Sequence, residues 1–316
     1  MTTPVIPAGT TKEVLPENKK SIKARERRNA MFGWAFLSPF LLFFAFSFLI
    51  PIVVSVRAAF FREVSKGGLF GGGEKVETFV GLQNFKEVAL GSTFWTGIGR
   101  VLLFGAIQIP VMIIGALALA LLLDSLLVNR VGFFRLGYFM PYAVPGIVAA
   151  LVWVYLYNNQ IGPVGRVLNI DFFGHTWILA GMANMTTWTF TGYNMLIFLA
   201  ALQAIPTDLY EAARLDGASE WMIVWKIKVP MVRAAALLAV LLSIIGTVQL
   251  FNEPAAMAVK ASWMGGSYMP MQMAYNTMVG TVSPSGAGPA NAISIMMALV
   301  ASVLAVIYAW AQKKVD

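Results

Sequence analysis

The sequence contains no cysteine and a single histidine, His175. The absence of cysteine excludes disulfides and thiolate sites. One histidine cannot form a metal cluster alone, so we interpret His175 as a loop residue. No segment follows the G-x-x-x-x-G-K-S/T pattern whose backbone amides hold nucleotide phosphates. The nearest run, the glycine-rich residues 71–75, is interpreted as a flexible connector. We therefore expect the chain to bind no nucleotide and no cofactor of its own.

Charged residues are also scarce, at 12% of the 316 residues, against about 25% in typical soluble domains. Hydrophobic residues make up 58% of the chain and are gathered into long blocks, which indicates that the bilayer is the solvent. Blocks of about 20 residues are long enough to cross a bilayer as helices. The sequence predicts an all-α polytopic membrane protein with six transmembrane helices, at residues 31–56, 98–123, 137–157, 177–202, 234–251 and 289–310.

The first 30 residues are polar and basic, so we predict a partly disordered tail ahead of a membrane domain at 31–316. The first apolar block is too long for the core of a cleaved signal peptide and is interpreted as a span. With the N-terminus inside, 15 Lys and Arg residues lie in cytoplasmic segments and six in outside loops. This bias predicts a multi-pass protein of the bacterial cytoplasmic membrane with both termini cytoplasmic. It also accounts for the net charge of +8 without a nucleic-acid partner.

Ionisable side chains are nearly absent from the predicted spans, since Arg57, Arg100 and Glu253 all lie close to span ends. Ion-coupled carriers usually place carboxylates at mid-depth. A membrane-embedded enzyme would need a buried nucleophile, a metal set or an acid pair. Neither pattern is visible, so we expect any energy for transport to enter through another subunit.

Residues 203–233 read as two short helices joined by a turn. Thr207 or Asp208 can cap the first helix, with Glu211 completing a capping box. Gly217 supplies the break because glycine accepts a left-handed conformation. The second helix is expected to begin after Ser219 as its cap and to end at Pro230. On the first helix, we expect one face to contact the membrane domain and the other to face the cytosol: Leu209, Ala212, Ala213 and Leu215 against Asp208, Glu211 and Arg214.

The string Glu211-Ala212-Ala213, followed by Gly217, Ile227 and Pro230, resembles the EAA loop of ABC importer permeases. The fuller strings YEAARLDGAS and IKVP are most similar to the carbohydrate branch, the maltose-type permeases, although residue 229 is Val where Leu is commoner. Other segments of the membrane region also resemble this family: 81–85, 134–153, 192–206 and 251–254.

This resemblance implies the type I permease fold, packed against a second, homologous permease subunit. It also implies two ATPase subunits that bind the ATP, and an extracytoplasmic solute-binding protein. The EAA loop would insert into a cleft on an ATPase and transmit its closure. The residues that the resemblance assigns to this coupling are Glu211, Ala212, Asp216, Gly217 and Pro230.

The resemblance also places a substrate site at mid-membrane on the helices that flank the loop. Tyr193 and Ser243 match family positions, whereas Gly246 and Thr247 replace a larger aromatic residue and an amide. Aromatic faces and amides suit a sugar, here a di- or oligosaccharide. The alternatives are a non-sugar solute, such as a glycerol phosphodiester or a polyol, and simple helix packing by Ser and Thr. The candidate contacts are Thr186, Thr189, Tyr193, Asn194, Ser243, Thr247, Gln249 and Asn252.

Overall fold

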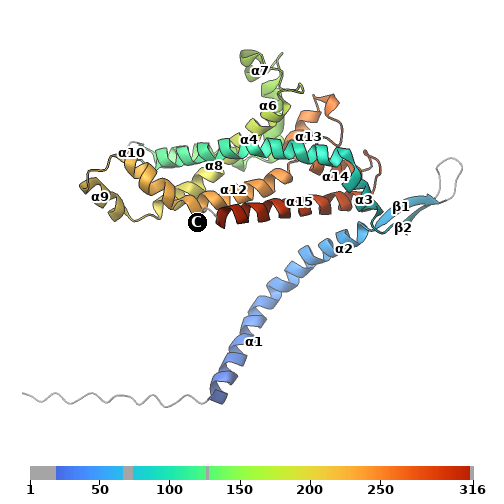
Figure 1. Cartoon of the computed structure of the whole chain (residues 1–316), viewed down its shortest axis with the longest axis horizontal. Helices are drawn as coiled ribbons and strands as arrows, with labels where there is room; N and C mark the ends of the chain where they lie inside the picture. The colour runs from blue at the N-terminus through green and yellow to red at the C-terminus, as the bar shows by residue number, and fades with distance from the viewer. Residues whose placement is uncertain (1–18, 67–73, 126–127, 314–316) are drawn as a thin grey trace, which may run out of the picture. The chain divides into compact units, whose positions relative to one another are not determined.

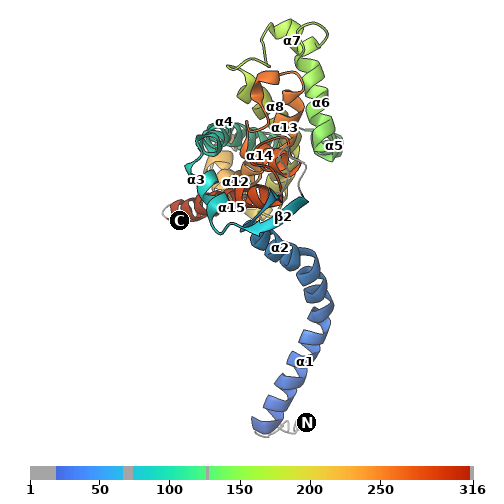
Figure 2. The same cartoon turned by 90° about the vertical axis from the view of Figure 1, so that its right-hand side faces the viewer.

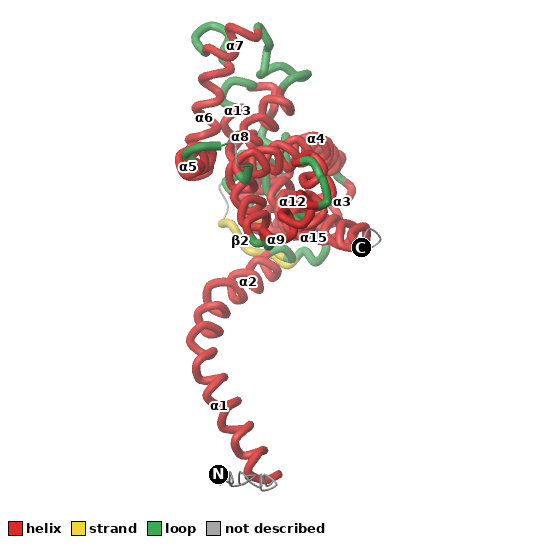
Figure 3. The backbone as a smooth tube through the Cα atoms, turned by 90° about the vertical axis from the view of Figure 1, so that its left-hand side faces the viewer, coloured by secondary structure: helices red, strands yellow, loops and turns green. Residues whose placement is uncertain are grey.

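The computed structural model describes residues 19–66, 74–125 and 128–313. It consists of helices except for one hairpin, formed by strands β1 (Phe61–Lys66) and β2 (Glu74–Phe79), which pair antiparallel (Figures 1 and 3). The hairpin lies in the segment between the first two spans, where no strand was predicted. The tail before residue 19 and part of the connector at 71–75 lie outside the described residues.

The chain divides into two compact units, residues 1–55 and 56–316. The described part of the first unit is one helical run: α1, a π-helical turn η1, and the start of α2. Residues 19–30 were expected in the irregular tail but are the first turns of α1. Their Lys, Arg, Ala and Glu residues are strong helix formers that continue the helix beyond the apolar block. The bounds are Lys19–Phe44, Ala45–Leu49 and Ile50–Ala58.

The second unit contains the remaining helices, which the structure describes over the following bounds: α3 Gln83–Leu90, α4 Ser92–Leu123, α5 Val131–Ala143, α6 Gly146–Tyr157, α7 Pro163–Leu168, α8 Ile178–Gln203, α9 Thr207–Leu215, α10 Glu220–Ile223, the π turn η2 Val224–Lys228, α11 Val229–Met231, α12 Arg233–Val248, α13 Asn252–Ala258, the 3₁₀ turn η3 Ser262–Met264, α14 Pro270–Met278 and α15 Ala287–Lys313.

Four described helical runs are long and apolar enough to cross a membrane, at Arg25–Ala58, Ser92–Leu123, Arg233–Ala258 and Ala287–Lys313. Two bent helix pairs bring the number to six if each pair is one span: α5 with α6, bent by 96°, and α8 with α9, bent by 68°. The all-helical polytopic prediction is therefore confirmed. The span predicted at 137–157 corresponds to α5 and α6, between which the chain turns at Val144 and Pro145. Proline lacks an amide hydrogen and disfavours the helical conformation in the residue before it.

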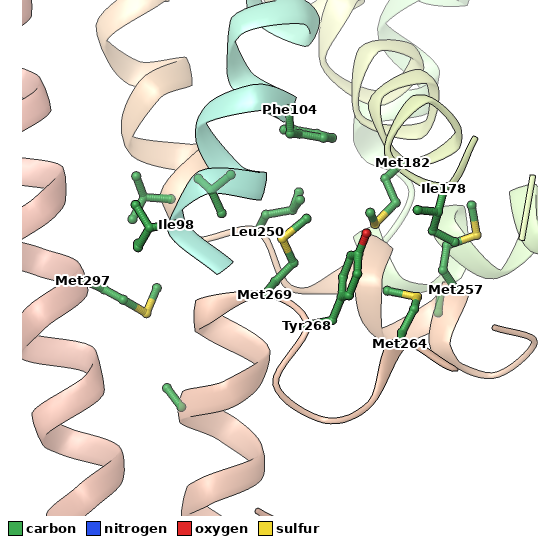
Figure 4. Close-up of a cluster of buried hydrophobic side chains, with 14 of the residues drawn as sticks. Ile98, Phe104, Ile178, Met182, Leu250, Met257, Met264, Tyr268, Met269 and Met297 are labelled. Atoms are coloured by element: carbon green, nitrogen blue, oxygen red, sulfur yellow. The ribbon is translucent and has the colours of Figure 1, made fainter. Parts of the chain in front are cut away.

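The core of the second unit forms where α4 packs along α8, with α5 and α12 against these two helices. Gly192 of α8 lets α5 approach closely, because a Cβ there would overlap the carbonyl oxygen of Tyr138 in α5. A buried cluster rich in methionine includes Met182, Met257 and Met269 together with Phe104 (Figure 4). Viewed along the bundle, α6 and α7 extend away from the packed helices (Figure 2). The hairpin and α3 lie at one end of this unit, and α9 and α10 lie at the other (Figure 1).

Candidate functional site

A cavity of about 350 Å³ lies inside the second unit, where α4, α5, α8 and α12 meet the start of α13. Most of its wall comes from the middle of α8 and from the end of α12 with the residues that follow. The lining residues are Gln108, Met112, Tyr142, Thr186, Phe190, Tyr193, Asn194, Leu242, Ser243, Gly246, Thr247, Gln249, Leu250, Phe251, Asn252 and Glu253.

The cavity brings together seven of the eight residues predicted to contact a solute: Thr186, Tyr193, Asn194, Ser243, Thr247, Gln249 and Asn252. Thr189 does not line it. Its side chain is buried at 7% exposure, and its hydroxyl donates to the carbonyl oxygen of Met185 at 3.0 Å. At about 100° per residue, Thr189 projects from the edge of the stripe that Thr186 and Tyr193 form on α8. Its role as a contact stays a prediction.

One wall of the cavity is aromatic. Tyr193 of α8 stacks on Tyr142 of α5, with ring centroids 4.7 Å apart and planes 19° apart. Phe190 meets the same Tyr142 edge-on at 5.7 Å. Tyr142 was missed in the sequence, because it lies on α5, and only the packing of α5 against α8 brings its ring to Tyr193. The close approach of α5 to Gly192 holds these rings together.

The wall beside the aromatic rings carries amide groups. Gln108 and Asn194 are buried, at 2% and 4% exposure, on α4 and α8. The Gln108 amide donates to the Met112 sulfur at 3.3 Å, and the Asn194 amide donates to the Phe190 carbonyl oxygen at 3.0 Å. A thioether is a weak acceptor. The Gln108 amide can therefore exchange this contact for a stronger one with a hydroxyl.

Glu253 is a further lining residue that sequence reasoning did not assign to the site. It is 7% exposed and lies in the first turn of α13. Among the lining residues that the structure describes, it is the only carboxylate, and none is Lys, Arg or His. The signal in the sequence was its position next to Asn252, a predicted contact. No group of three or more potential metal ligands occurs within the described residues.

The EAA loop forms the predicted pair of helices, α9 and α10. Gly217 has φ +83°, the left-handed conformation that glycine accepts at the lowest cost. The Gly217 amide donates to the Arg214 carbonyl oxygen at 3.0 Å, and the Ala218 amide donates to that of Ala213 at 2.9 Å. These two bonds form a Schellman motif. The hydroxyl of Ser219 caps α10 by accepting from the Met222 amide at 3.3 Å, as predicted.

Two local predictions for this loop are wrong. The position before α9 is Pro206, whose side chain makes no capping hydrogen bond, so the expected capping box is absent from α9. Pro230 does not end the second helix. The chain continues through η2 into α11, where Pro230 lies in the first turn. A proline is tolerated there because its missing amide hydrogen is not needed at the start of a helix.

The apolar side chains of the loop point mostly to its surface. Only Ala213 of the face expected to contact the membrane domain is partly covered; Leu209, Ala212 and Leu215 are exposed, Leu215 at 89%. Trp221, Met222 and Trp225 are exposed as well, at 71%, 50% and 54%. The orientation prediction for Leu209, Ala212 and Leu215 is therefore wrong for this chain. These apolar side chains of the loop are therefore not covered by the rest of the chain.

The polar residues of the loop are arranged around Arg214. Its guanidinium pairs with Glu220 at 2.7 Å, and this hydrogen bond holds the pKa of the Glu220 carboxyl below its ordinary value. Glu211 is exposed on α9, and Ala212, Asp216, Gly217 and Pro230 are exposed as well. The five predicted coupling residues are thus all on the surface of the loop.

A cavity among spans and a two-helix loop at one end together define an all-helical, polytopic membrane protein of the transporter class. Residues 132–316 match the family described as binding-protein-dependent transport system inner membrane component. The chain belongs to this family. It is a multi-pass inner-membrane protein, and it is the permease component of such a transport system rather than an enzyme.

Relatives with assigned names are also permeases. The chain is 30% identical over 237 residues to the probable ABC transporter permease protein YurN of Bacillus subtilis, covering 72% of this chain and 78% of that one. It is 30% identical to the trehalose/maltose transport system permease protein MalF of Thermococcus litoralis, covering 71% and 76%. The lactose transport system permease protein LacF of Rhizobium radiobacter is 29% identical, covering 70% of this chain and 74% of that one.

A solved structure has the same fold. It is a chain of a bacterial ABC transporter that imports the acidic polysaccharide alginate, with a TM-score of 0.75 at 17% identity. The similarity covers 94% of this chain and 100% of that chain. A second crystal structure of the alginate transporter, in complex with an alginate-bound periplasmic protein, matches with a TM-score of 0.72 at 17% identity. That match covers 90% of this chain and 94% of the other.

Proposed function

We propose that this permease translocates an uncharged sugar, a di- or oligosaccharide, through the cavity between α4, α8 and α12. The observation that carries the proposal is the cavity wall, which joins the stacked Tyr142 and Tyr193 to a set of amides and hydroxyls. Aromatic faces cover the C–H surface of a sugar ring, while amides and hydroxyls bind its hydroxyl groups. Two relatives, named as lactose and trehalose/maltose transport system permeases, favour the same class of solute.

The charge of the cavity favours a sugar over a glycerol phosphodiester. An anion in the cavity would face the Glu253 carboxylate, with no cationic side chain among the described lining residues. Like charges at short range in a poorly solvated site repel strongly. A neutral sugar can instead donate hydroxyl hydrogens to this carboxylate. A neutral polyol stays the alternative, and it would leave part of the aromatic wall uncovered.

The partners of the proposed assembly are a second homologous permease, two ATPase subunits and an extracytoplasmic solute-binding protein. The exposed loop would dock in a cleft of an ATPase, with Trp221, Leu215 and Met222 in the apolar centre of the contact. Glu211, Ala212, Asp216, Gly217 and Pro230 would transmit the movement. This arrangement puts both termini and the loop on the cytoplasmic side, in agreement with the bias of Lys and Arg.

The test of the solute class is uptake into proteoliposomes that contain the whole transporter and its binding protein. Labelled maltose, trehalose and lactose are compared with a glycerol phosphodiester and with a polyol, glucitol. We expect ATP-dependent uptake of at least one disaccharide, and strong loss of it in Tyr193→Ala. Leu299→Ala, a change outside the cavity lining at a residue 55% exposed on α15, is the matched control. Uptake of the phosphodiester or the polyol alone would contradict the proposal.

The orientation is tested with single cysteines, because the chain has none of its own. We expect a cysteine at Ser267 to react with an impermeant reagent added outside intact cells. A cysteine at Ser219, in the loop, should react only after the membrane is opened. Labelling of position 219 from outside would reverse the proposed topology.

A further inference from the structure

A buried ion pair ties the loop to the end of α4. The Lys228 ammonium lies 2.6 Å from Oδ2 of Asp124, and the two side chains are only 10% and 15% exposed. Lys228 is the last residue of η2, and Asp124 is the residue that follows α4. The pair therefore joins segments 104 residues apart in the sequence. Figure 1 shows α10 beside this end of α4.

The first helix of the loop meets the same ammonium. The Tyr210 ring of α9 has its centroid 5.0 Å from the Lys228 nitrogen, within the range of a cation–π contact. The Tyr210 hydroxyl is buried and has no hydrogen-bond partner among the described residues. The Lys228 ammonium, on η2, thus contacts both α9 and the end of α4. A displacement of either half of the loop acts on this one point.

From the ion pair, α4 leads to the cavity. Met112 of α4 lines the cavity, and from Met112 to Leu123 the helix is regular and free of proline. At 1.5 Å per residue, this stretch spans about 18 Å from the cavity wall to Asp124. A helix of this kind moves as a rod, so a pull on Asp124 also shifts the wall at Met112.

We propose that the Asp124–Lys228 pair is the joint through which movement of the loop reaches α4 and the cavity. The inference rests on the proposed coupling role of the loop. Loop movement reaches α12 through the chain itself, which continues from η2 through α11. The movement reaches α4 only through contacts that do not follow the chain. A buried pair resists separation because each charge would be left without its partner in a poorly solvated place, whereas apolar surfaces can slide past each other.

The reporter for this movement is a cysteine at Leu242, a cavity-lining residue of α12 that is 46% exposed. Its reaction with a maleimide is followed in inside-out vesicles that contain the whole transporter, with and without ATP and vanadate. If the loop couples to the cavity, trapping the ATPases should slow the labelling. This readout requires no knowledge of the solute.

Four variants of the pair separate coupling from folding. Asp124→Asn and Lys228→Met each remove one charge. Asp124→Leu with Lys228→Met replaces the pair by apolar groups, a change that often keeps or raises stability. Asp124→Lys with Lys228→Asp reverses the pair. We expect the first three to reduce the vanadate effect on labelling by at least about tenfold, and the reversed pair to restore most of it. ATPase subunits should still co-purify with the apolar double variant.

The control removes a different ion pair of similar length. Arg62 and Glu87 pair at 2.6 Å between β1 and α3, at the other end of this unit. Arg62→Met with Glu87→Gln should leave the vanadate effect unchanged. Full slowing in the apolar double variant would reduce the Asp124–Lys228 pair to a structural contact and overturn the inference. No slowing in the chain with the native pair, or no ATPase bound to it, would instead count against the proposed coupling of the loop itself.

Discussion

The cavity and the EAA loop belong to the same compact unit but differ in how complete they are. In the cavity, polar groups such as Gln108 and Asn194 are buried, and their amides donate to neighbouring atoms of this chain. On the loop, Leu215 and Trp221 are 89% and 71% exposed. The packing of this chain alone can fix the shape of the cavity. The exposed apolar surface of the loop, in contrast, is stabilised only when another protein covers it. Substitutions at the cavity wall should therefore lower the stability of the chain itself, whereas substitutions on the loop should impair only the assembled transporter.

The largest expected effect belongs to the packing that holds the cavity wall. Gly192→Ala places a methyl group on the Tyr138 carbonyl oxygen and forces α5 away from α8. We expect a loss of stability above the about 1–3 kcal/mol typical of overpacking. The measurement is thermal unfolding of the solubilised chain by tryptophan fluorescence.

The matched control for Gly192 is Gly99→Ala in α4, where a Cβ would have no neighbour within 4 Å. This variant should be unchanged or more stable by up to about 1 kcal/mol, because alanine favours the helix over glycine. Equal stability of both variants would show that the α5–α8 contact does not hold the cavity in shape.

Glu211→Ala should be the largest effect on the loop, and it should be visible only in the assembly. The carboxylate is exposed on α9. Paired with a cation in a desolvated cleft, it would cost about 3–5 kcal/mol to remove. We expect normal stability of the chain, weaker binding of the ATPase subunits and more ATP hydrolysed per solute. Asp208→Ala, on the same helix, is the control. Full uptake at the ordinary ATP cost in Glu211→Ala would assign this residue no part in coupling.

Gly217→Val should have a smaller effect on the same loop. A β-branched residue at φ +83° is strained by about 1–2 kcal/mol, which should change the angle between α9 and α10. Uptake in proteoliposomes should fall while the chain still inserts in the membrane. Gly217→Asn should keep uptake, because asparagine tolerates the left-handed conformation. Loss of uptake in both variants would point to the small size of glycine rather than its conformation.

Glu220→Gln should have the smallest effect, because the Arg214–Glu220 pair is exposed. The pKa of Glu220 is lowered in the folded chain from the ordinary value of 4.5, so the pair contributes stability above that pH. The contribution is lost as the pH falls through the lowered value. The difference in unfolding midpoint between the variant and the native chain should therefore be slightly smaller at about pH 3 than at pH 7. A large difference at pH 7 would mean that this pair orders the loop.

Features that depend on local sequence or on spacing were predicted well. The apolar blocks indicated the spans. The candidate contacts, taken from the resemblance to maltose-type permeases and from nearby amides, include seven residues that line one cavity. The left-handed turn at Gly217 and the helix cap at Ser219 were predicted from the conformational preferences of glycine and serine. The resemblance could supply Tyr193 and Ser243 because they match family positions directly.

Features that depend on contacts between distant segments were missed. Asp124 and Lys228 pair across 104 residues, and nothing in either segment indicates the other. The stacking of Tyr142 on Tyr193 depends on the packing of α5 against α8, which the sequence does not indicate. The spacing of Leu209 and Leu215 along α9 does not determine which way they point, because an apolar helix face can pack on the bundle or on a partner protein. Thr186 and Thr189 are equally plausible contacts in the sequence, and only the orientation of α8 about its axis shows that Thr186 lines the cavity and Thr189 does not.

The hydrogen bonds that join α9 to α10 have a consequence for the speed and strength of assembly. The bonds from Gly217 to Arg214 and from Ala218 to Ala213 are made within the chain, before any partner is present. Ordering one residue costs about 1–2 kcal/mol of backbone entropy. For this turn, the entropy is lost when the permease folds, so the loss does not weaken later binding of the loop to another subunit. In the proposed assembly, the loop would meet an ATPase as a preorganised ligand, and substitutions of its surface side chains would mainly change the dissociation rate.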